Sequence, residues 1–368
     1  MLQKFKVQNY RNFRDEFVWD LSNVKNYEFH ENLVPGGILK NAIVYGENAS
    51  GKSNLGYAMM DLLLHLTDTS HNVLKQRRHY VNLDGNDRLV RFEYVFSFDS
   101  NILTYYYEKE EPEKVLREKI TINHREVLSA DQGCEAKVSL KGTEQLNLEL
   151  WDGSISLAKY VARNTVPDKS DADSRTFLQF VQFVERMLWF SSAEGSCYAG
   201  YCNRMGSIGK NLVEMDAVEE LQEFLHDFGI DVKLTVGEDE EDKNLYCIHK
   251  NKAVLFQDVW SSGTRALAFL FLWYLQMKEM SFVFIDEFDA FYHYELAEAV
   301  VRKLVSLGAQ IIFTSHNTDL ISNELLRPDC YFELKDNQIS SFADRTVKAL
   351  RQAHNIQKMY KAGAFDEK

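Results

Sequence analysis

Residues 46–53 form a complete G-x-x-x-x-G-K-[ST] loop, and this motif constrains the fold more strongly than any other segment of the chain. The apolar residues 41–45 before it are typical of a buried strand, and residues 54–64 after it have the pattern of a helix. Strand, loop and helix in this order form the setting in which such a motif cradles phosphate groups. The residues expected around the phosphates are Gly46, Glu47, Asn48, Ala49, Ser50, Gly51, Lys52, Ser53 and Asn54.

The chemistry of this loop indicates a nucleoside triphosphate together with Mg²⁺. Glycines at both ends let the main chain curl so that its N–H groups face phosphate oxygens, and the positive end of the helix dipole faces the same anion. Lys52 is expected to reach the β- and γ-phosphates, and Ser53 to supply an oxygen ligand to Mg²⁺. A chance match to four fixed positions is the alternative, and a second constellation farther along the chain argues against it.

Residues 282–287, Phe-Val-Phe-Ile-Asp-Glu, have the Walker B pattern of an apolar strand that ends in two carboxylates. Asp286 is expected to hold Mg²⁺, directly or through water, and Glu287 to act as the general base for the attacking water. An acidic surface turn after a core strand is the alternative interpretation. The presence of the P-loop upstream favours the Walker B interpretation, in which both carboxylates take part in catalysis.

Residues 310–317 repeat this design, because an apolar strand again ends in polar residues. A histidine at such a tip can contact a γ-phosphate, so His316 is expected to sense that phosphate and to stabilise developing charge. Taken alone, His316 would more often be a hydrogen-bonded loop residue. The prediction therefore depends on its neighbours.

Residues 260–265, Trp-Ser-Ser-Gly-Thr-Arg, form a Ser/Gly turn directly before the apolar run 266–275. A helix that begins at such a turn offers a second anion site at its N-terminus. Since the P-loop already holds the triphosphate of its own subunit, we expect this second site to serve a nucleotide bound to another protomer. The pattern therefore predicts a homodimer or higher homo-oligomer with shared ATP sites.

The order P-loop, Ser-Ser-Gly-Thr, Asp-Glu and His resembles the ABC-type ATPases, and within them the SMC/RecF-like and overcoming-lysogenisation-defect-like branch. Residues 5–13 are similar to the NFR-x-F start of that branch. Residues 286–293 are similar to the DE-x-x-x-x-LHP segment of small AAA/ABC-like ATPases of bacterial anti-phage operons, and residues 355–365 resemble the ending of that group. The resemblance spans both ends of the chain.

The resemblance implies roles for four further residues. Ser261 and Gly263 are the signature residues that would close over a γ-phosphate across a dimer interface. Arg11 and Asn12 are expected near the ribose or the phosphates of the nucleotide.

Some positions depart from the family pattern. Thr264 stands where many relatives carry Gln, His293 occupies the position of the transporter D-loop Asp, and Tyr294 replaces the usual proline. Communication across the dimer is therefore less firmly predicted than nucleotide binding. The candidates for a Q-loop glutamine are Gln76, Gln179 and Gln182, and the choice among them stays open.

Composition indicates a soluble cytoplasmic protein. The 368 residues are 45% hydrophobic and 26% charged, enough for a sizeable core. The N-terminus has no signal-peptide pattern, and the longest apolar stretch, residues 266–277, falls short of the roughly 20 residues that span a bilayer. Five cysteines without a C-x-x-C pair favour reduced thiols. We expect no membrane insertion.

The acidic balance does not indicate broad nucleic-acid binding. The net charge is −13 and the pI is about 5.3, although a local basic surface could persist in an acidic protein. Residues 75–79 are the candidate cluster, and a solvated helix end or loop is the favoured interpretation.

We expect an α/β, ABC-ATPase-like P-loop fold with an antiparallel β subdomain and a helical lobe. Residues 1–150 are predicted to form an N-terminal ATPase lobe with the P-loop and β-hairpins, residues 151–245 a mainly helical lobe, and residues 246–368 a C-terminal ATPase lobe. The main elements expected are strands at 89–98 and 103–108, helices at 177–190, 218–225 and 344–361, and a hairpin tip at 238–242.

Three function classes follow. The favoured one is an ATP-controlled dimerising switch, the sensor or regulator of a two-component anti-phage defence system whose partner effector is encoded nearby. Residues after His316 are too few for the Toprim nuclease of the lysogenisation-defect relatives, so any nuclease is expected in another chain. The alternative is a RecF/SMC-like DNA-maintenance ATPase; a transporter motor has no supporting sign. This choice rests on analogy.

Overall fold

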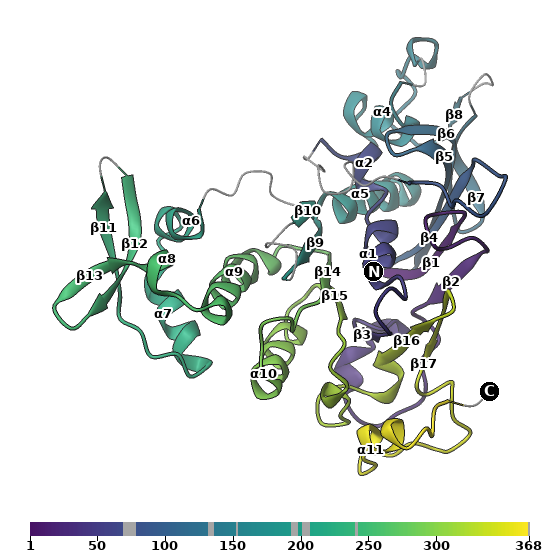
Figure 1. The fold of residues 1–368 in the computed structure, drawn as a ribbon. Coiled ribbons are helices and arrows are strands. Elements are labelled where there is room, and N and C mark those ends of the chain that lie inside the picture. The colour runs from purple at the N-terminus through teal and green to yellow at the C-terminus, as the bar shows by residue number, and fades with distance from the viewer. Residues whose placement is uncertain are drawn as a thin grey trace.

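The chain folds around three β-sheets, which the computed structural model shows together with the helices that cover them (Figure 1). The structure describes residues 1–68, 79–131, 136–151, 154–192, 198–200, 207–239 and 242–366. Within these ranges the sheets have seven, seven and three strands. The predicted α/β fold with an antiparallel subdomain is confirmed.

The sheet that carries the P-loop, called the P-loop sheet below, has the order β10-β9-β14-β15-β3-β16-β17. Its five inner strands are parallel, and the two edge strands run antiparallel to their neighbours. Every residue of β3, β9, β14 and β15 is buried, as expected for parallel strands covered on both faces. The bounds are β10 (Tyr198–Gly200), β9 (Met187–Ser191), β14 (Phe282–Asp286), β15 (Gln310–Thr314), β3 (Asn41–Tyr45), β16 (Tyr331–Lys335) and β17 (Gln338–Ser341).

The helix after the P-loop, α1 (Lys52–Met59), lies directly on this sheet. A Cβ added at Gly56 would lie 2.6 Å from the ring of Phe284 and 2.9 Å from Nε1 of Trp189, so only a glycine allows this close approach to β14 and β9. The helix predicted over residues 54–64 is interrupted after Met59 and resumes as α2 (Leu63–Leu66).

One segment predicted as a helix is partly a strand. Helix α5 (Ala172–Glu185) ends before Arg186, and β9 then enters the P-loop sheet between β10 and β14. The predicted helix over 177–190 is therefore wrong for residues 187–190. A short apolar run has no periodicity that separates a fully buried strand from a buried helix, because both bury every side chain.

The second seven-stranded sheet is antiparallel, in the order β2-β1-β4-β5-β6-β7-β8. Its inner face is covered by α5 and α4 (Leu157–Asn164), and β4 alternates between buried and half-buried residues. The hairpin predicted from strands 89–98 and 103–108 is confirmed by the pairing of β4 with β5. The bounds are β2 (Phe17–Asp20), β1 (Leu2–Gln8), β4 (Val90–Phe98), β5 (Asn101–Glu111), β6 (Lys114–Ile122), β7 (Arg125–Asp131) and β8 (Lys137–Val138).

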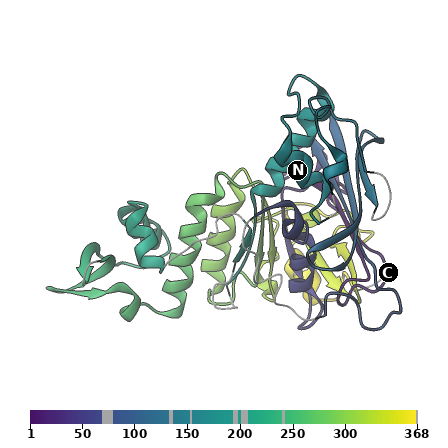
Figure 2. The ribbon, with the colours of Figure 1, turned by 90° about the horizontal axis from the view of Figure 1, so that it is seen from above.

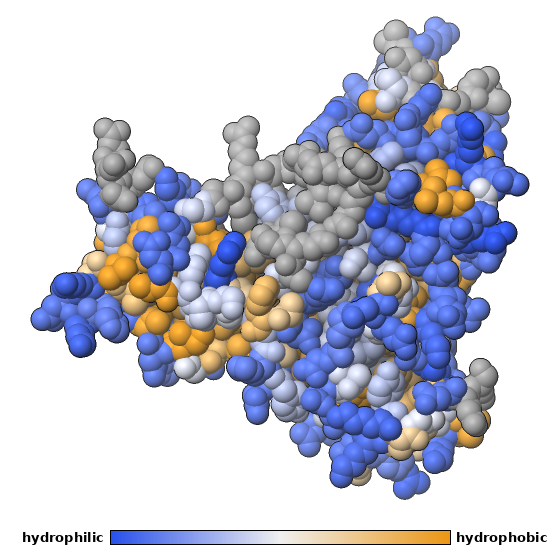
Figure 3. Space-filling view, in the orientation of Figure 1, coloured by the Kyte–Doolittle hydropathy of each residue, from blue (hydrophilic) through white to orange (hydrophobic). Residues whose placement is uncertain are grey.

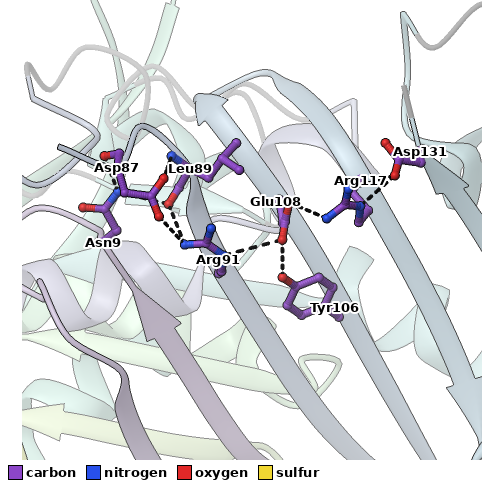
Figure 4. A network of polar contacts seen from close by, with 8 residues as sticks. All are labelled: Asn9, Asp87, Leu89, Arg91, Tyr106, Glu108, Arg117 and Asp131. Atoms are coloured by element: carbon purple, nitrogen blue, oxygen red, sulfur yellow. Dashed lines mark hydrogen bonds and ion pairs between the residues drawn. The ribbon is translucent and has the colours of Figure 1, made fainter. Parts of the chain in front are cut away.

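Charge pairs cross the outer face of this antiparallel sheet (Figure 4). Glu108 lies between two arginines, 3.5 Å from Arg91 Nε and 3.1 Å from Arg117 Nη1. Arg91 also contacts Asp87 at 2.6 Å, and Arg117 contacts Asp131 at 2.9 Å. Both arginines are therefore already paired with carboxylates on this face.

A side lobe extends from the P-loop sheet, at the left of Figure 1, and Figure 2 shows it projecting away from both large sheets. Helix α9 (Ser262–Met277) packs against α6 and α7 of this lobe and leads to β14. The helix predicted at 218–225 and the hairpin around 238–242 are confirmed by α7 and by the β11–β12 pairing. The bounds are β11 (Leu234–Asp239), β12 (Asp242–His249), β13 (Lys252–Leu255), α6 (Ile208–Glu214), α7 (Val218–Asp227) and α8 (Phe256–Val259).

Residues 151–245 are distributed over three places in this layout. Helices α4 and α5 cover the antiparallel sheet, β9 and β10 belong to the P-loop sheet, and α6, α7 and β11 belong to the side lobe. The domain boundaries given above stay predictions. None of the helices in the described ranges is long and apolar enough to cross a membrane. Cys247 and Cys330 are free thiols, and the other three cysteines lie outside the described residues.

The C-terminal segment is less helical than predicted. Of residues 344–361, only α11 (Ile356–Lys361) is an α-helix. The carbonyls of Arg351, Gln352 and His354 instead accept hydrogen bonds from Asn323 Nδ2, so a side chain replaces the helical partners. The remaining elements are α10 (Tyr294–Val305) and the 3₁₀ turns η1 (Glu31–Leu33), η2 (Pro35–Gly37), η3 (Leu148–Leu150), η4 (Thr318–Leu320) and η5 (Pro328–Cys330).

Candidate functional site

Three parallel strands of the P-loop sheet end at one edge, which brings their C-terminal loops together. Strand β15 lies between β3 and β14, and Phe313 is in register with both Ile43 and Ile285. The P-loop follows β3, Glu287 follows β14, and His316 follows β15. Ligand sites of open α/β sheets lie outside such carboxyl ends.

The P-loop curls tightly at two positions with left-handed main chain. Gly51 has φ 101° and caps α1, while Ala49 has φ 64°. A Cβ added at Gly46 would lie 2.7 Å from the carbonyl oxygen of Leu334 in β16. The first glycine is therefore required by close packing and the last one by its conformation.

Lys52 points back into its own loop. Its Nζ donates hydrogen bonds to the carbonyls of Gly46 at 2.7 Å and Glu47 at 3.0 Å, and the residue is 5% exposed. Burial lowers the pKa of Lys52, and the carboxylates of Asp286 and Glu287 oppose that shift. The charge of the ammonium group is therefore influenced by both Walker B carboxylates.

Asp286 and Glu287 are connected through a residue that the sequence analysis did not single out. Thr314, the last residue of β15, donates its hydroxyl hydrogen to Asp286 Oδ1 at 2.7 Å and accepts a hydrogen bond from the Glu287 amide at 2.8 Å. Asp286 is 2% exposed. Glu287 has φ 48°, a conformation that non-glycine residues adopt at a cost and that clusters at functional sites.

His316 lies beside Glu287 on the solvent side of this group. Its Nε2 is 3.9 Å from Glu287 Oε1, and the side chains are 41% and 39% exposed. Such a pair is too long and too solvated to fix both groups as a strong salt bridge. Both side chains therefore remain open to a ligand at the mouth of the P-loop.

A second carboxylate ties the loops after β14 and β15 together. Asp289 Oδ2 accepts the hydroxyl hydrogen of Ser315 at 2.7 Å, and Ser315 Oγ accepts from the Asn317 amide at 2.8 Å. Burial raises the pKa of Asp289, and the hydrogen bond from Ser315 opposes that rise. Neither residue had been assigned a role from the sequence, where the polar residues Thr314 and Ser315 before His316 were the available signal.

Arg11 and Asn12 reach the P-loop from the N-terminal turn. Arg11 lies 5.3 Å and 5.2 Å from the ring centres of Tyr10 and Tyr57, and its Nη1 donates to Asn54 Oδ1 at 3.2 Å. Asn54 Nδ2 in turn donates to Asn12 Oδ1 at 2.6 Å. The structure therefore places Arg11 and Asn12, which the family resemblance predicted near the nucleotide, at the first turn of α1.

Ser53 and Asp286 are the residues with which a magnesium ion would be held. A hydroxyl and a carboxylate are hard oxygen donors that suit Mg²⁺, which keeps several waters and takes further oxygens from phosphates. Within the described ranges there is no group of three or more His, Cys, Asp or Glu side chains that could hold a metal by itself. The donor set fits a metal that arrives with a triphosphate.

The signature segment forms a separate site. Ser261 caps α9, with its Oγ accepting from the Thr264 amide at 3.1 Å, and residues 261–264 line a cavity of about 720 Å³. The rest of its described lining comes from residues 227–230 and from the segment between Phe291 and Ala299, with no P-loop residue among them. The geometry thus separates Ser261 and Gly263 from the other predicted site residues.

The lining of this cavity is mixed, with polar and apolar side chains. Phe291, which lines it, is 43% exposed, Val259 just before the signature segment is 51% exposed, and Figure 3 shows hydrophobic residues gathered on the side lobe. His293 caps α10 without a side-chain hydrogen bond to the helix, and Tyr294 begins that helix.

No Q-loop glutamine is found among the candidates that the structure describes. Gln179 and Gln182 lie on α5, which covers the antiparallel sheet, and Gln179 Nε2 donates to Asp99 at 3.0 Å. Gln76 lies outside the described residues.

Comparison with known proteins gives one family match. Residues 220–322 match the family described as "AAA domain, putative AbiEii toxin, Type IV TA system". This segment contains the signature, Walker B and His316 positions but not the P-loop, and it covers less than half of the chain. Together with the P-loop geometry, the match supports a P-loop ATPase. No curated protein sequence matches the chain.

Several solved structures are similar at low identity. The SMC head domain from Thermotoga maritima is 14% identical with a TM-score of 0.43, over 90% of this chain and 94% of that one. An Smc head domain with an extended coiled coil, bound to the C-terminal domain of ScpA derived from Pyrococcus furiosus, is 12% identical with a TM-score of 0.44, over 93% and 97%. An SmcHead bound to the C-winged helix domain of ScpA is 12% identical with a TM-score of 0.45, over 92% and 97%.

Proposed function

We propose that this protein is a Mg²⁺-dependent ATPase whose two copies close over shared nucleotides. The observation that carries the proposal is the convergence of Lys52, Asp286, Glu287 and His316 at one edge of the P-loop sheet, with Thr314 joining the two carboxylate positions. A phosphate cradle beside a candidate base and a metal-binding carboxylate has the parts that phosphoryl transfer to water requires.

Each residue has a distinct task in this proposal. Lys52 would exchange the Gly46 and Glu47 carbonyls for the β- and γ-phosphate oxygens. Glu287 would take a proton from the attacking water, and His316 would donate a hydrogen bond to the γ-phosphate region. Mg²⁺, held through Ser53 and Asp286, would neutralise charge on the phosphate oxygens.

If two copies share each nucleotide, the signature residues Ser261 and Gly263 are expected to lie apart from the P-loop of their own chain. The N-terminus of α9 offers backbone N–H groups and a favourable dipole to an anion, yet its cavity contains no residue of the same chain's P-loop among the described ones. A second copy would supply the missing phosphate. The apolar surface at Val259 and Phe291 would be covered in the same contact.

The mass of the protein in solution tests this proposal. We expect the E287Q variant to double its mass with Mg-ATP, because it binds but does not hydrolyse the nucleotide, whereas K52A/E287Q should keep its starting mass. Absence of ATP binding by the wild-type protein would overturn the P-loop assignment. ATP binding without any change of mass would overturn the dimer.

The biological role that we propose is control of a partner effector in a defence operon. The family description names a putative toxin of a toxin–antitoxin system, and that statement concerns the family. Purification together with the products of neighbouring genes, with ATP and with ADP, tests the role. A neighbour captured in one nucleotide state and released in the other would support it, and no nucleotide-dependent capture would contradict it.

Several cations on the outer face of the antiparallel sheet are already paired, which offers no support for an extended DNA footprint there. Lys4, Lys6 and Lys119 on this face contact carboxylates at 2.7 to 2.9 Å. Arg91 and Arg117 do so at 2.6 and 3.1 Å. Lys and Arg side chains bind DNA phosphates by displacing the counterions of the DNA, and a cation that is already paired with a carboxylate is less available for this. Of the basic cluster 75–79, residues 75–78 lie outside the described ranges. Tight duplex binding at physiological salt would favour the DNA-maintenance alternative.

A further inference from the structure

The carboxamide of Asn12 lies directly on the P-loop. A Cβ added at Gly51 would be 2.4 Å from Asn12 Nδ2, so the amide group occupies the space that any larger residue at position 51 would need. Gly51 is also the cap of α1, the end of the helix that faces the proposed phosphates. The orientation of Asn12 therefore bears on the shape of the nucleotide site.

Both polar atoms of this carboxamide are engaged, and their partners come from two different parts of the chain. Oδ1 accepts from Asn54 in the first turn of α1 at 2.6 Å. Nδ2 donates to Oδ1 of Asn337 at 2.7 Å, across a sequence separation of 325 residues. Asn337 thus fixes which way the Asn12 amide faces.

Asn337 is held in place by the turn between β16 and β17. Lys335 pairs with Gln338, and the two turn residues Asp336 and Asn337 have φ of 51° and 58°. Two left-handed residues in a two-residue loop are the hairpin turn that Asn, Asp and Gly favour. Since Leu334 in the same hairpin packs against Gly46, this hairpin contacts the P-loop at its first glycine as well.

We propose that Asn337 is a nucleotide-positioning residue, which acts by locking the Asn12 carboxamide across Gly51. The β16–β17 hairpin is then one wall of the nucleotide site, and not only an edge of the sheet. This inference rests on the proposed function of the P-loop. It adds a residue for which neither the P-loop nor the other motifs of the sequence gave a signal.

The variant N337G tests this role without disturbing the turn. Glycine accepts the left-handed conformation and removes only the side chain. We expect the dissociation constant of Mg-ATP, measured with a fluorescent ATP analogue, to rise roughly 2- to 10-fold, the range that one lost hydrogen bond gives. KM should rise with it while kcat at saturating ATP changes little. The matched control D336G alters the same turn and should bind as the wild type does.

A double-mutant cycle separates action through Asn12 from a general loosening of the hairpin. If Asn337 acts through Asn12, N12A/N337G should bind Mg-ATP no more weakly than N12A alone. Additive losses, equal losses in D336G and N337G, or unchanged affinity in N337G would each overturn the inference. If the wild type fails to bind Mg-ATP and matches K52A, the P-loop assignment itself fails, a result distinct from these.

Discussion

The hydroxyl of Thr314 donates a hydrogen bond to Asp286 Oδ1 at 2.7 Å while it accepts one from the Glu287 amide at 2.8 Å. This single oxygen joins the end of β15 to the two residues at the end of β14. It orients the carboxylate proposed for Mg²⁺ and also the main chain that carries the proposed base. The strained φ of 48° at Glu287 is held by this contact.

Removal of this hydroxyl should slow the chemical step more than nucleotide binding. Because a hydrogen bond to a charged group contributes about 1.5 to 3 kcal/mol, T314V should lower kcat by about 10-fold or more. T314S keeps the hydroxyl and should retain most of the activity. Steady-state ATPase assays with a parallel measurement of ATP affinity decide this. Equal rates for T314V and the wild type would contradict the coupling.

Substitution of Glu287, the proposed general base, should lower kcat more than T314V does. E287Q keeps the size of the side chain but cannot take a proton from water, so kcat should fall by about 10²- to 10⁴-fold. ATP affinity should stay near the wild-type value, because Lys52 and the loop are untouched. Single-turnover hydrolysis with equilibrium ATP binding measures both quantities. Hydrolysis by E287Q at the wild-type rate would assign the base elsewhere, and His316 would be the next residue to substitute.

Glu118 gives the protein a pH-dependent stability that is independent of the nucleotide site. It is 1% exposed in the antiparallel sheet and accepts hydrogen bonds from Tyr105 at 3.1 Å, from Ser156 at 3.0 Å and from the Leu157 amide. Burial raises the pKa of Glu118 above its ordinary value, and these hydrogen bonds oppose the rise. The folded protein therefore holds this proton more tightly than the unfolded chain does.

The raised pKa of Glu118 in the folded state determines how the free energy of unfolding changes with pH. As the pH rises from the ordinary Glu pKa of about 4.3 through the raised value, the wild type should lose stability relative to E118Q, and the difference should then become constant. Urea unfolding of both proteins between acidic and neutral pH measures it. A stability difference that grows in favour of the wild type with rising pH would show that the folded-state pKa is lowered instead.

The sequence was informative where one residue type is required by conformation or chemistry. The P-loop, the Asp286–Glu287 pair and His316 each follow an apolar strand, so their placement at one sheet edge could be predicted from pattern alone. Their catalytic roles stay predictions. The strand at residues 187–190 could not be separated from a helix, since a fully buried run lacks the alternation that marks a half-exposed strand.

Contacts between segments that are distant in the chain could not be predicted from the sequence. Thr314 and Asn337 are ordinary polar residues in the chain, and only the folded sheet places one beside Asp286 and the other beside Asn12. The C-terminal helix was overpredicted because an Asn323 side chain, distant in sequence, supplies the hydrogen bonds that a helix would otherwise make. Such tertiary partners override local propensity.

A fully buried ion pair connects the end of the P-loop helix to the antiparallel sheet. Lys109 Nζ lies 2.6 Å from Asp61 Oδ1, with side chains 0% and 1% exposed, and Asp61 also accepts from Tyr80 and Tyr107 at 2.8 and 2.9 Å. Burial lowers the pKa of Lys109, and the Asp61 carboxylate opposes that shift. The pair sits just beyond Met59, where α1 ends.

Loss of one partner should cost far more than loss of both charges. K109M leaves the Asp61 carboxylate buried with hydroxyl partners alone, and the free energy of unfolding should fall by about 3 to 5 kcal/mol. In D61N/K109M no charge is stranded, and the amide oxygen can still accept from Tyr80 or Tyr107, so part of that loss should be recovered. The matched control is K6M on the same sheet, where Lys6 contacts Glu93 at 2.9 Å but both side chains are 29% exposed; there about 1 kcal/mol or less is expected. Urea unfolding of the wild type, K109M, D61N, D61N/K109M and K6M decides the matter. A double variant as unstable as the sum of D61N and K109M would mean that Asp61 and Lys109 contribute independently.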